Sequence, residues 1–133
     1  MRNIPKAAVW LGIALIVVTG LVHFVDAPDA FDEATYKGLL FIANGLGALL
    51  AAYGIARGAR WGWLLGLLVA GGAFAGYVAS RTVGLPGLPP EPDAWLEPLG
   101  VVSLLAEGGL VALALWAMGG IASVVPRRTT RAS

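Results

Sequence analysis

Four stretches of the chain are rich in apolar residues and nearly free of charge, and short polar segments separate them. The stretches are 7–25, 38–56, 61–80 and 99–121. Because an α-helix rises ~1.5 Å per residue, even the shortest of them reaches ~29 Å, about the thickness of the hydrocarbon core of a bilayer. The pattern therefore predicts an all-α membrane protein with four transmembrane helices in an antiparallel up-down bundle.

The polar segments predict the connections between these helices. Residues 26–37 and 81–98 are expected to be loops, and residues 57–60 a tight turn. We call residues 81–98 the proline loop, because five of the eight prolines of the chain lie there. Proline fixes φ and lacks an N–H, so this segment is expected to be extended, with one short helical turn near 94–97. Residues 126–133 form a basic tail that is predicted to be disordered.

Composition supports a membrane protein and excludes several functions. Of the 133 residues, 58% are hydrophobic and 13% are charged, against roughly 25% charged in soluble domains. The length allows one domain. A net charge of +1, with the basic residues spread over short segments, predicts no nucleic-acid partner. The absence of cysteine excludes disulfides, thiolate metal sites and thiol nucleophiles.

The first apolar stretch allows a second interpretation, a cleavable signal peptide. The start of the chain is basic, and Val25-Asp26-Ala27 resembles a small-residue cleavage site. The apolar part of a signal peptide is usually only about 7–15 residues long. The longer stretch 7–25 therefore favours a retained transmembrane helix.

Basic and acidic residues lie in different segments, which predicts an orientation. The two chain ends and the turn 57–60 carry seven of the nine basic residues and no acid, while the other two loops carry seven of the eight acids. Four spans place these two sets on opposite sides of the membrane. Because basic segments stay inside, both termini are expected in the cytoplasm, with the chain as a multi-pass protein of the cell membrane.

Pairs of glycines spaced four apart predict close helix packing. They are Gly54-xxx-Gly58, Gly62-xxx-Gly66 and Gly72-xxx-Gly76. Small residues on one face let two backbones approach closely in lipid. The alternative is that such pairs arise by chance in a chain with 19 glycines.

Glu107 is the one charged residue inside an apolar stretch, and it is the first candidate for a functional role. A carboxylate in the bilayer interior costs about 2.5–3.5 kcal/mol, so it should face the bundle, be paired or be protonated. Ser103 stands one turn away on the same face. The alternative role for Glu107 is a neutral side chain that hydrogen-bonds a neighbouring helix.

Further polar residues fall in the half of the predicted bundle that adjoins the proline loop. His23 lies one turn after Thr19, and Asn44 lies at about the depth of Glu107, close enough in the prediction to hydrogen-bond it. Tyr77 and Arg81 lie one turn apart at the end of the third helix. Each has a purely structural alternative: His23 at the membrane interface, Asn44 as a hydrogen bond between helices and Arg81 at the lipid headgroups. Arg81 could instead pair with Glu107, Glu97 or an anion.

Together these residues predict a polar pocket that opens to the outside beneath the proline loop. The candidate pocket residues are His23, Asn44, Tyr77, Arg81, Ser103 and Glu107. No catalytic constellation and no set of metal ligands occurs at recognisable spacing, so no metal or other cofactor is expected.

Two short patterns carry a resemblance. They are His23-xxxx-Pro28-Asp29-x-Phe31 with Gly38, and Ser80-Arg81-Thr82-x-Gly84-Leu85-Pro86. Over most of its length the chain resembles a group of small four-helix membrane proteins common in high-GC Gram-positive bacteria, to which no function is assigned. Members of that group often carry a second histidine before the phenylalanine, where this chain has Ala30. The resemblance implies the four-span architecture and no activity.

Three functions remain open from the sequence. The leading one is a non-enzymatic accessory or binding subunit, whose partners are the lipid bilayer and either another membrane protein or further copies of the chain. The second is an oligomeric transporter or channel element that uses Glu107 as a proton or cation site. The third is a haem- or metal-binding membrane protein that uses His23.

Overall fold

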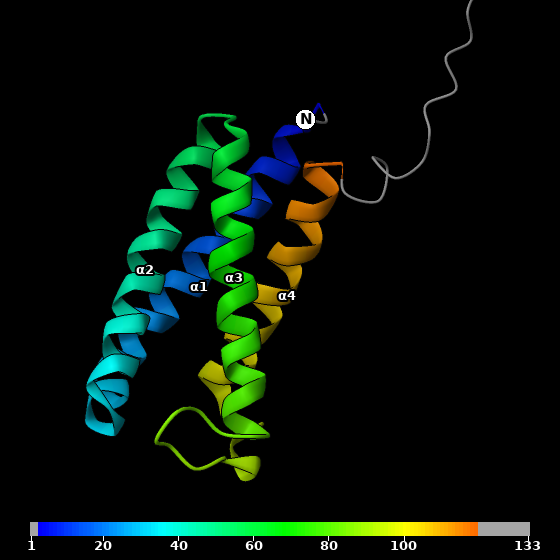
Figure 1. Ribbon diagram of the computed structural model, residues 1–133. Helices are drawn as coiled ribbons and strands as arrows, with labels where there is room; N and C mark the ends of the chain where they lie inside the picture. Colours follow the sequence, from blue (N-terminus) through cyan, green and yellow to red (C-terminus); the bar gives the residue numbers. More distant parts are fainter. Residues whose placement is uncertain (1–2, 120–133) are drawn as a thin grey trace, which may run out of the picture.

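The computed structural model describes residues 3–119, which form four long α-helices and one short 3₁₀ turn (Figure 1). The helices are α1 (Lys6–Glu33), α2 (Thr35–Ala56), α3 (Arg60–Arg81) and α4 (Pro98–Ala117), and the 3₁₀ turn η1 is Pro92–Ala94. All four helices are long and apolar enough to cross a membrane, judged by length and composition. The predicted all-α architecture is thus confirmed, and it is consistent with a multi-pass membrane protein.

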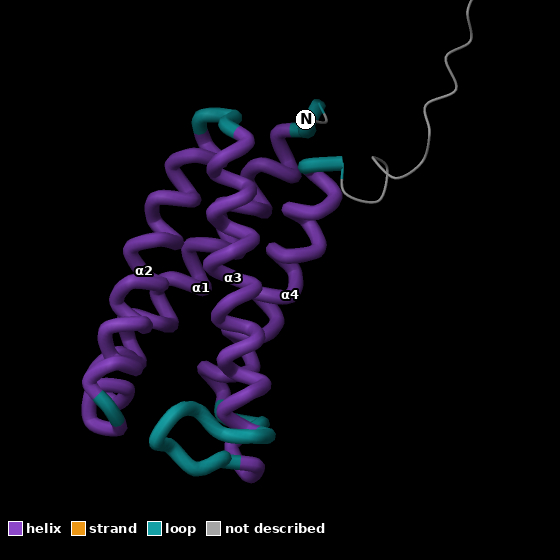
Figure 2. The backbone as a smooth tube through the Cα atoms, viewed as in Figure 1, coloured by secondary structure: helices purple, strands orange, loops and turns teal. Residues whose placement is uncertain are grey.

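The helices run in alternating directions and form a ring in chain order (Figure 2). Each helix packs on the next, and α4 also packs on α1. Helices α2 and α4 lie on opposite sides of the ring, and within residues 3–119 their backbones do not pack on each other. Below, the loop end of the bundle is the end that carries the proline loop, and the terminal end is the opposite one, where α1 starts and α4 stops.

The connection between α1 and α2 differs from the predicted loop 26–37. Helix α1 continues to Glu33 and α2 begins at Thr35. Only Ala34 between them is extended, with φ −163° and ψ 141°. Hydropathy indicates whether a segment enters lipid and not whether it is helical. The helical conformation of the polar end of α1 could therefore not be predicted from it.

Packing against α2 holds this polar extension of α1 in helical form. Ala27 and Ala30 are buried, and the ring of Phe31 covers Gly38 of α2, where a Cβ would collide with it. Pro28 lies inside the helix, where its ring removes one backbone hydrogen bond. The contacts on both sides of Pro28 keep the helix continuous through that position.

The turn between α2 and α3 brings the two backbones into contact at the terminal end. Gly58 has φ +70°, Ala59 N–H donates to the Gly54 carbonyl and Gly58 N–H to the Ile55 carbonyl, which is the Schellman arrangement that ends helices at a glycine. A Cβ at Gly62 would collide with the backbone of Gly54 and Ile55. The predicted close packing of α2 on α3 is therefore confirmed at Gly54 and Gly62.

The third glycine pair does not make the predicted packing contact. A Cβ at Gly72 or Gly76 would meet no atom within 4 Å, because both glycines face away from the neighbouring helices. The spacing of a glycine pair fixes a face of a helix, but only the rotation of that helix decides what the face meets.

The last predicted span, 99–121, is longer than the helix that the structure shows. Helix α4 stops at Ala117, and Gly119 adopts a left-handed φ of +74° that ends it. Residues 120–121 and the predicted basic tail 126–133 lie outside the described residues.

Apolar and polar side chains divide the interior of the bundle into two halves. The apolar core fills the terminal half, and its large members are Ile16, Ile55, Trp63 and Leu110, with alanines between them. The polar residues that are buried within the described chain all lie towards the loop end: Thr19, His23, Ser80, Ser103 and Glu107. The predicted contrast between the two halves is thus present inside the bundle.

Candidate functional site

On α1, the polar side chains of the loop-end half are bound to their own helix. The Thr19 hydroxyl donates to the Leu15 carbonyl at 3.0 Å. Nδ1 of His23 lies 2.8 Å from the Thr19 carbonyl oxygen. A carbonyl oxygen can only accept, so Nδ1 carries the proton of this hydrogen bond and Nε2 is the nitrogen left for another partner. The ring packs on Phe41 of α2 at 4.9 Å between centroids.

Asn44 joins α2 to α3 and does not reach Glu107. Its Nδ2 donates to the Val69 carbonyl of α3 at 3.0 Å. Its Oδ1 is buried and has no hydrogen-bond partner among the described residues. The predicted hydrogen bond between Asn44 and Glu107 is therefore wrong: the two depths are similar, but α2 and α4 lie on opposite sides of the ring.

Glu107 and Ser103 form a buried pair on α4. The Ser103 hydroxyl donates to Oε1 of Glu107 at 2.5 Å. Glu107 is only 1% exposed, and its Oε2 is buried with no partner among the described residues. The predicted inward orientation of Glu107 and its contact with Ser103 are confirmed. Arg81 is not its partner.

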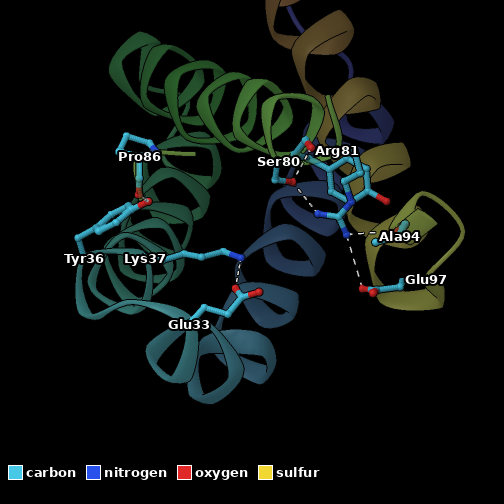
Figure 3. A network of polar contacts seen from close by, with 9 residues as sticks. Glu33, Tyr36, Lys37, Ser80, Arg81, Pro86, Ala94 and Glu97 are labelled. Carbon is cyan, nitrogen blue, oxygen red and sulfur yellow. Dashed lines mark hydrogen bonds and ion pairs between the residues drawn. The ribbon is translucent and has the colours of Figure 1, made fainter. Parts of the chain in front are cut away.

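Arg81 instead holds the base of the proline loop (Figure 3). Its guanidinium lies over the ring of Tyr77, 3.9 Å from the centroid. One terminal nitrogen donates to the Ser80 hydroxyl at 2.7 Å. The other is 3.4 Å from the Ala94 carbonyl and 3.5 Å from a carboxylate oxygen of Glu97. Of the alternatives that the sequence left open for Arg81, the structure shows the pairing with Glu97.

Tyr77 is the second anchor of the proline loop. Its hydroxyl donates to the Trp95 carbonyl at 2.9 Å, and its ring meets the Trp95 ring edge-on at 5.7 Å. The first turn of α4 passes so close that a Cβ at Gly100 would lie 2.8 Å from the Tyr77 hydroxyl. Tyr77 therefore links α3, the proline loop and α4.

The proline loop itself is folded on α3. The N–H of Gly84, at φ +86°, donates to the Ala79 carbonyl at 2.7 Å, and the N–H of Glu91 donates to the Ser80 carbonyl at 2.9 Å. Leu88 N–H closes a tight turn on the Leu85 carbonyl at 2.8 Å. The predicted short helical turn is present slightly earlier, as η1.

Tyr36 makes a contact that was not predicted from the sequence. Its hydroxyl donates to the Pro86 carbonyl at 2.5 Å, which ties the first turn of α2 to the tip of the proline loop (Figure 3). On the same turn, Lys37 forms an ion pair with Glu33 of α1. The sequence placed Tyr36 inside the predicted loop 26–37, and no pattern gave its partner fifty residues away.

The hollows at the loop end do not gather the six predicted pocket residues. One is a cavity of about 10 Å³, roughly the volume that one water requires. The other is an open hollow of about 390 Å³ on the exposed side of the proline loop. Residues Glu33, Lys37, Ser80, Leu85, Leu88, Pro89 and Glu91 line the first, and Pro90, Glu91, Pro92, Asp93, Ala94 and Glu97 line the second.

The candidate residues thus belong to four separate sets of hydrogen bonds. Tyr77 and Arg81 act together, Ser103 and Glu107 form a pair, and His23 and Asn44 each have other partners. Within residues 3–119, no three His, Asp or Glu side chains lie close enough together to hold a metal ion.

Comparison with known proteins yields no relative. No protein-family model, no curated protein and no solved structure matches the chain.

Proposed function

We propose that the four helices span the cell membrane, with both termini and the Arg57–Arg60 turn in the cytoplasm and the proline loop outside. The charges of the described residues support this orientation. At the terminal end Lys6, Arg57 and Arg60 are basic and no acid accompanies them, whereas the loop end is mainly acidic.

Within the membrane, the chain acts as a non-enzymatic accessory or binding subunit that presents the proline loop to another membrane protein. The observation that carries this proposal is that polar side chains of α3 hold the proline loop in one fixed shape. Tyr77 and Arg81, both predicted to line a pocket, fix the loop instead. Ordering a loop of this length costs conformational entropy, and a fixed shape lowers the cost of binding a partner.

The surface that this loop presents is suited to contact. Val83 is 83% exposed and Leu96 is 86% exposed, so two apolar side chains of the proline loop are almost fully exposed. Glu91 and Asp93 lie between them and are also exposed. A partner of this surface would combine apolar and basic groups.

Photo-crosslinking from the loop tests the proposal. A photoreactive amino acid in place of Leu96 is expected to give one discrete crosslinked product in cells. The matched control is Leu68 on α3, which is 64% exposed but lies within an apolar helix. Crosslinks to lipid alone, or the same products from both positions, would contradict a docking role for the proline loop.

Glu107 favours a second candidate, a proton or cation site in an oligomeric transporter or channel element. A buried carboxyl whose Oε2 has no partner among the described residues is costly to retain in a membrane unless it serves a purpose. Purified protein in liposomes would then carry proton or cation flux that Glu107→Gln abolishes. Equal flux from Glu107→Gln and the unaltered protein would exclude this role.

A further inference from the structure

The proline loop is attached unequally to the two halves of the bundle. It is bonded to α3 and the start of α4 through several contacts, which come from Tyr77, Ala79, Ser80 and Arg81 on α3 and include the ion pair with Glu97. To the α1–α2 hairpin the described residues show one hydrogen bond, from Tyr36 to Pro86. The loop therefore belongs mechanically to the α3–α4 hairpin.

The two hairpins are joined most firmly at the terminal end. There the large core side chains Ile16, Ile55, Trp63 and Leu110 interlock, and α2 touches α3 at Gly54 and Gly62. Towards the loop end the α1–α2 hairpin diverges from the α3–α4 hairpin, and the proline loop lies across the separation (Figures 1 and 2). Such an arrangement resembles a hinge that is packed at one end and bridged at the other.

The bridge covers a small polar space. The cavity of about 10 Å³ lies between Glu33 and Lys37 of the first hairpin, Ser80 of α3 and the loop residues Leu85 and Leu88. Ser80 is buried and the Lys37 side chain is only 14% exposed. Moving α3 and the loop together away from Glu33 and Lys37 would bring water to both Ser80 and Lys37.

The loop has internal contacts that hold its own shape. Pro86, Pro89 and Pro90 restrict the backbone at and beyond its tip, and the Leu85–Leu88 turn closes it internally. A displacement of the loop away from the first hairpin that keeps these internal bonds must break the bond to Tyr36, because among the described residues that is the loop's hydrogen bond to the α1–α2 hairpin.

We propose that the proline loop is a lid between the two helical hairpins, and that the hydrogen bond from Tyr36 to Pro86 is the latch that holds it closed. When the latch opens, the α3–α4 hairpin and the loop swing away together about the apolar core, and the space around Ser80 and Lys37 becomes accessible from the loop end. The lid needs no partner protein, so its test stands apart from the docking role proposed above.

Cysteine accessibility in the purified protein tests the latch. The chain has no cysteine, so each reporter is the single thiol. Ser80→Cys and Leu88→Cys report on the covered space, and Val83→Cys, at an 83% exposed position, reports on the surface. Each is combined with Tyr36→Phe, and its rate of reaction with a water-soluble maleimide is measured in detergent or lipid nanodiscs.

Removing one hydrogen bond should raise the rate at the covered positions roughly 3- to 10-fold. The rate at Val83→Cys should stay the same. Tyr53→Phe, which alters a tyrosine at the terminal end, should change none of the rates. Two reporters are used so that one misfolded variant does not leave the question open.

Three results would overturn the lid. The first is that Tyr36→Phe leaves the maleimide rate at Ser80→Cys and at Leu88→Cys unchanged. The second is an equal increase at Val83→Cys, which would mean general loosening. The third is the same increase with Tyr53→Phe, which would show that Tyr36 is no latch.

Discussion

At the scale of single residues, Arg81 shows why a planar cation stands at the base of the proline loop. It stacks on Tyr77 and reaches Ala94 and Glu97 with one terminal nitrogen while the other binds Ser80. A lysine keeps the charge but has no plane to stack and no second nitrogen.

We therefore expect Arg81→Lys to loosen the loop without unfolding the bundle. Amides in residues 82–97 should exchange with deuterium about tenfold faster, which corresponds to ~1.4 kcal/mol, the combined scale of a partly buried cation–π contact and a hydrogen bond. Hydrogen–deuterium exchange read by mass spectrometry measures this directly.

Arg57→Lys is the matched control for this change. Arg57 also lies over a tyrosine, Tyr53, but at 5.9 Å from the ring centroid and on an exposed turn. Arg57→Lys should leave the exchange rates of the amides in the turn within about twofold of those in the unaltered protein. If exchange in residues 82–97 were as slow in Arg81→Lys as in the unaltered protein, charge alone and not the stacked geometry of Arg81 would hold the proline loop.

Also at this scale, the sequence predicted that Ser103 and Glu107 lie inside the bundle on one face of a helix, but it did not predict the partners of Asn44 and Tyr36. Counting residues along a helix gives the depth of a side chain, because the rise is constant. It gives neither the order of the helices around the bundle nor the rotation of each. Asn44 and Glu107 were placed at similar depth and yet belong to helices on opposite sides of the ring, and the hydrogen bond from Tyr36 to Pro86 was not predicted.

At the scale of elements, the apolar stretches predicted four helices because helical segments of that length are what a bilayer accepts. The ends of α2 and α3 follow the predicted spans closely, since charged or glycine-containing turns limit them. The end of α1 does not, because its last two turns are polar and are held by contacts with α2 that leave no trace in hydropathy.

The glycines on α3 give a stability prediction at this scale. Gly62→Ala should lower the free energy of unfolding by about 1–3 kcal/mol, because the added methyl group meets the backbone of Gly54 and Ile55 and nothing flexible can yield. The change is measured by unfolding each variant, purified in mild detergent, through titration with sodium dodecyl sulfate.

Gly72→Ala on the same helix is its control. An added methyl group there meets no atom within 4 Å, and alanine favours a helix by up to about 1 kcal/mol over glycine. This variant should be as stable as the unaltered protein or slightly more so. A loss of stability at Gly72 equal to that at Gly62 would mean that Gly72 packs against another molecule, such as a second copy of the chain.

At the scale of the whole molecule, charge is distributed along the bundle axis. The described terminal end carries Lys6, Arg57 and Arg60, and the loop end carries Lys37 and Arg81 with seven acids. Both basic residues of the loop end are paired, Lys37 with Glu33 and Arg81 with Glu97. The unpaired positive charge of the described chain is thus confined to the terminal end, and it is positive charge that insertion keeps in the cytoplasm.

This asymmetry makes the orientation testable with two single cysteines. In intact cells a membrane-impermeant maleimide should label Val83→Cys in the proline loop and should not label Ala59→Cys in the turn between α2 and α3. Permeabilised cells should show both. The unaltered chain has no cysteine and sets the background. Labelling of Ala59→Cys alone in intact cells would show that the bundle has the opposite orientation. The proline loop would then face the cytoplasm and could dock only a cytoplasmic partner.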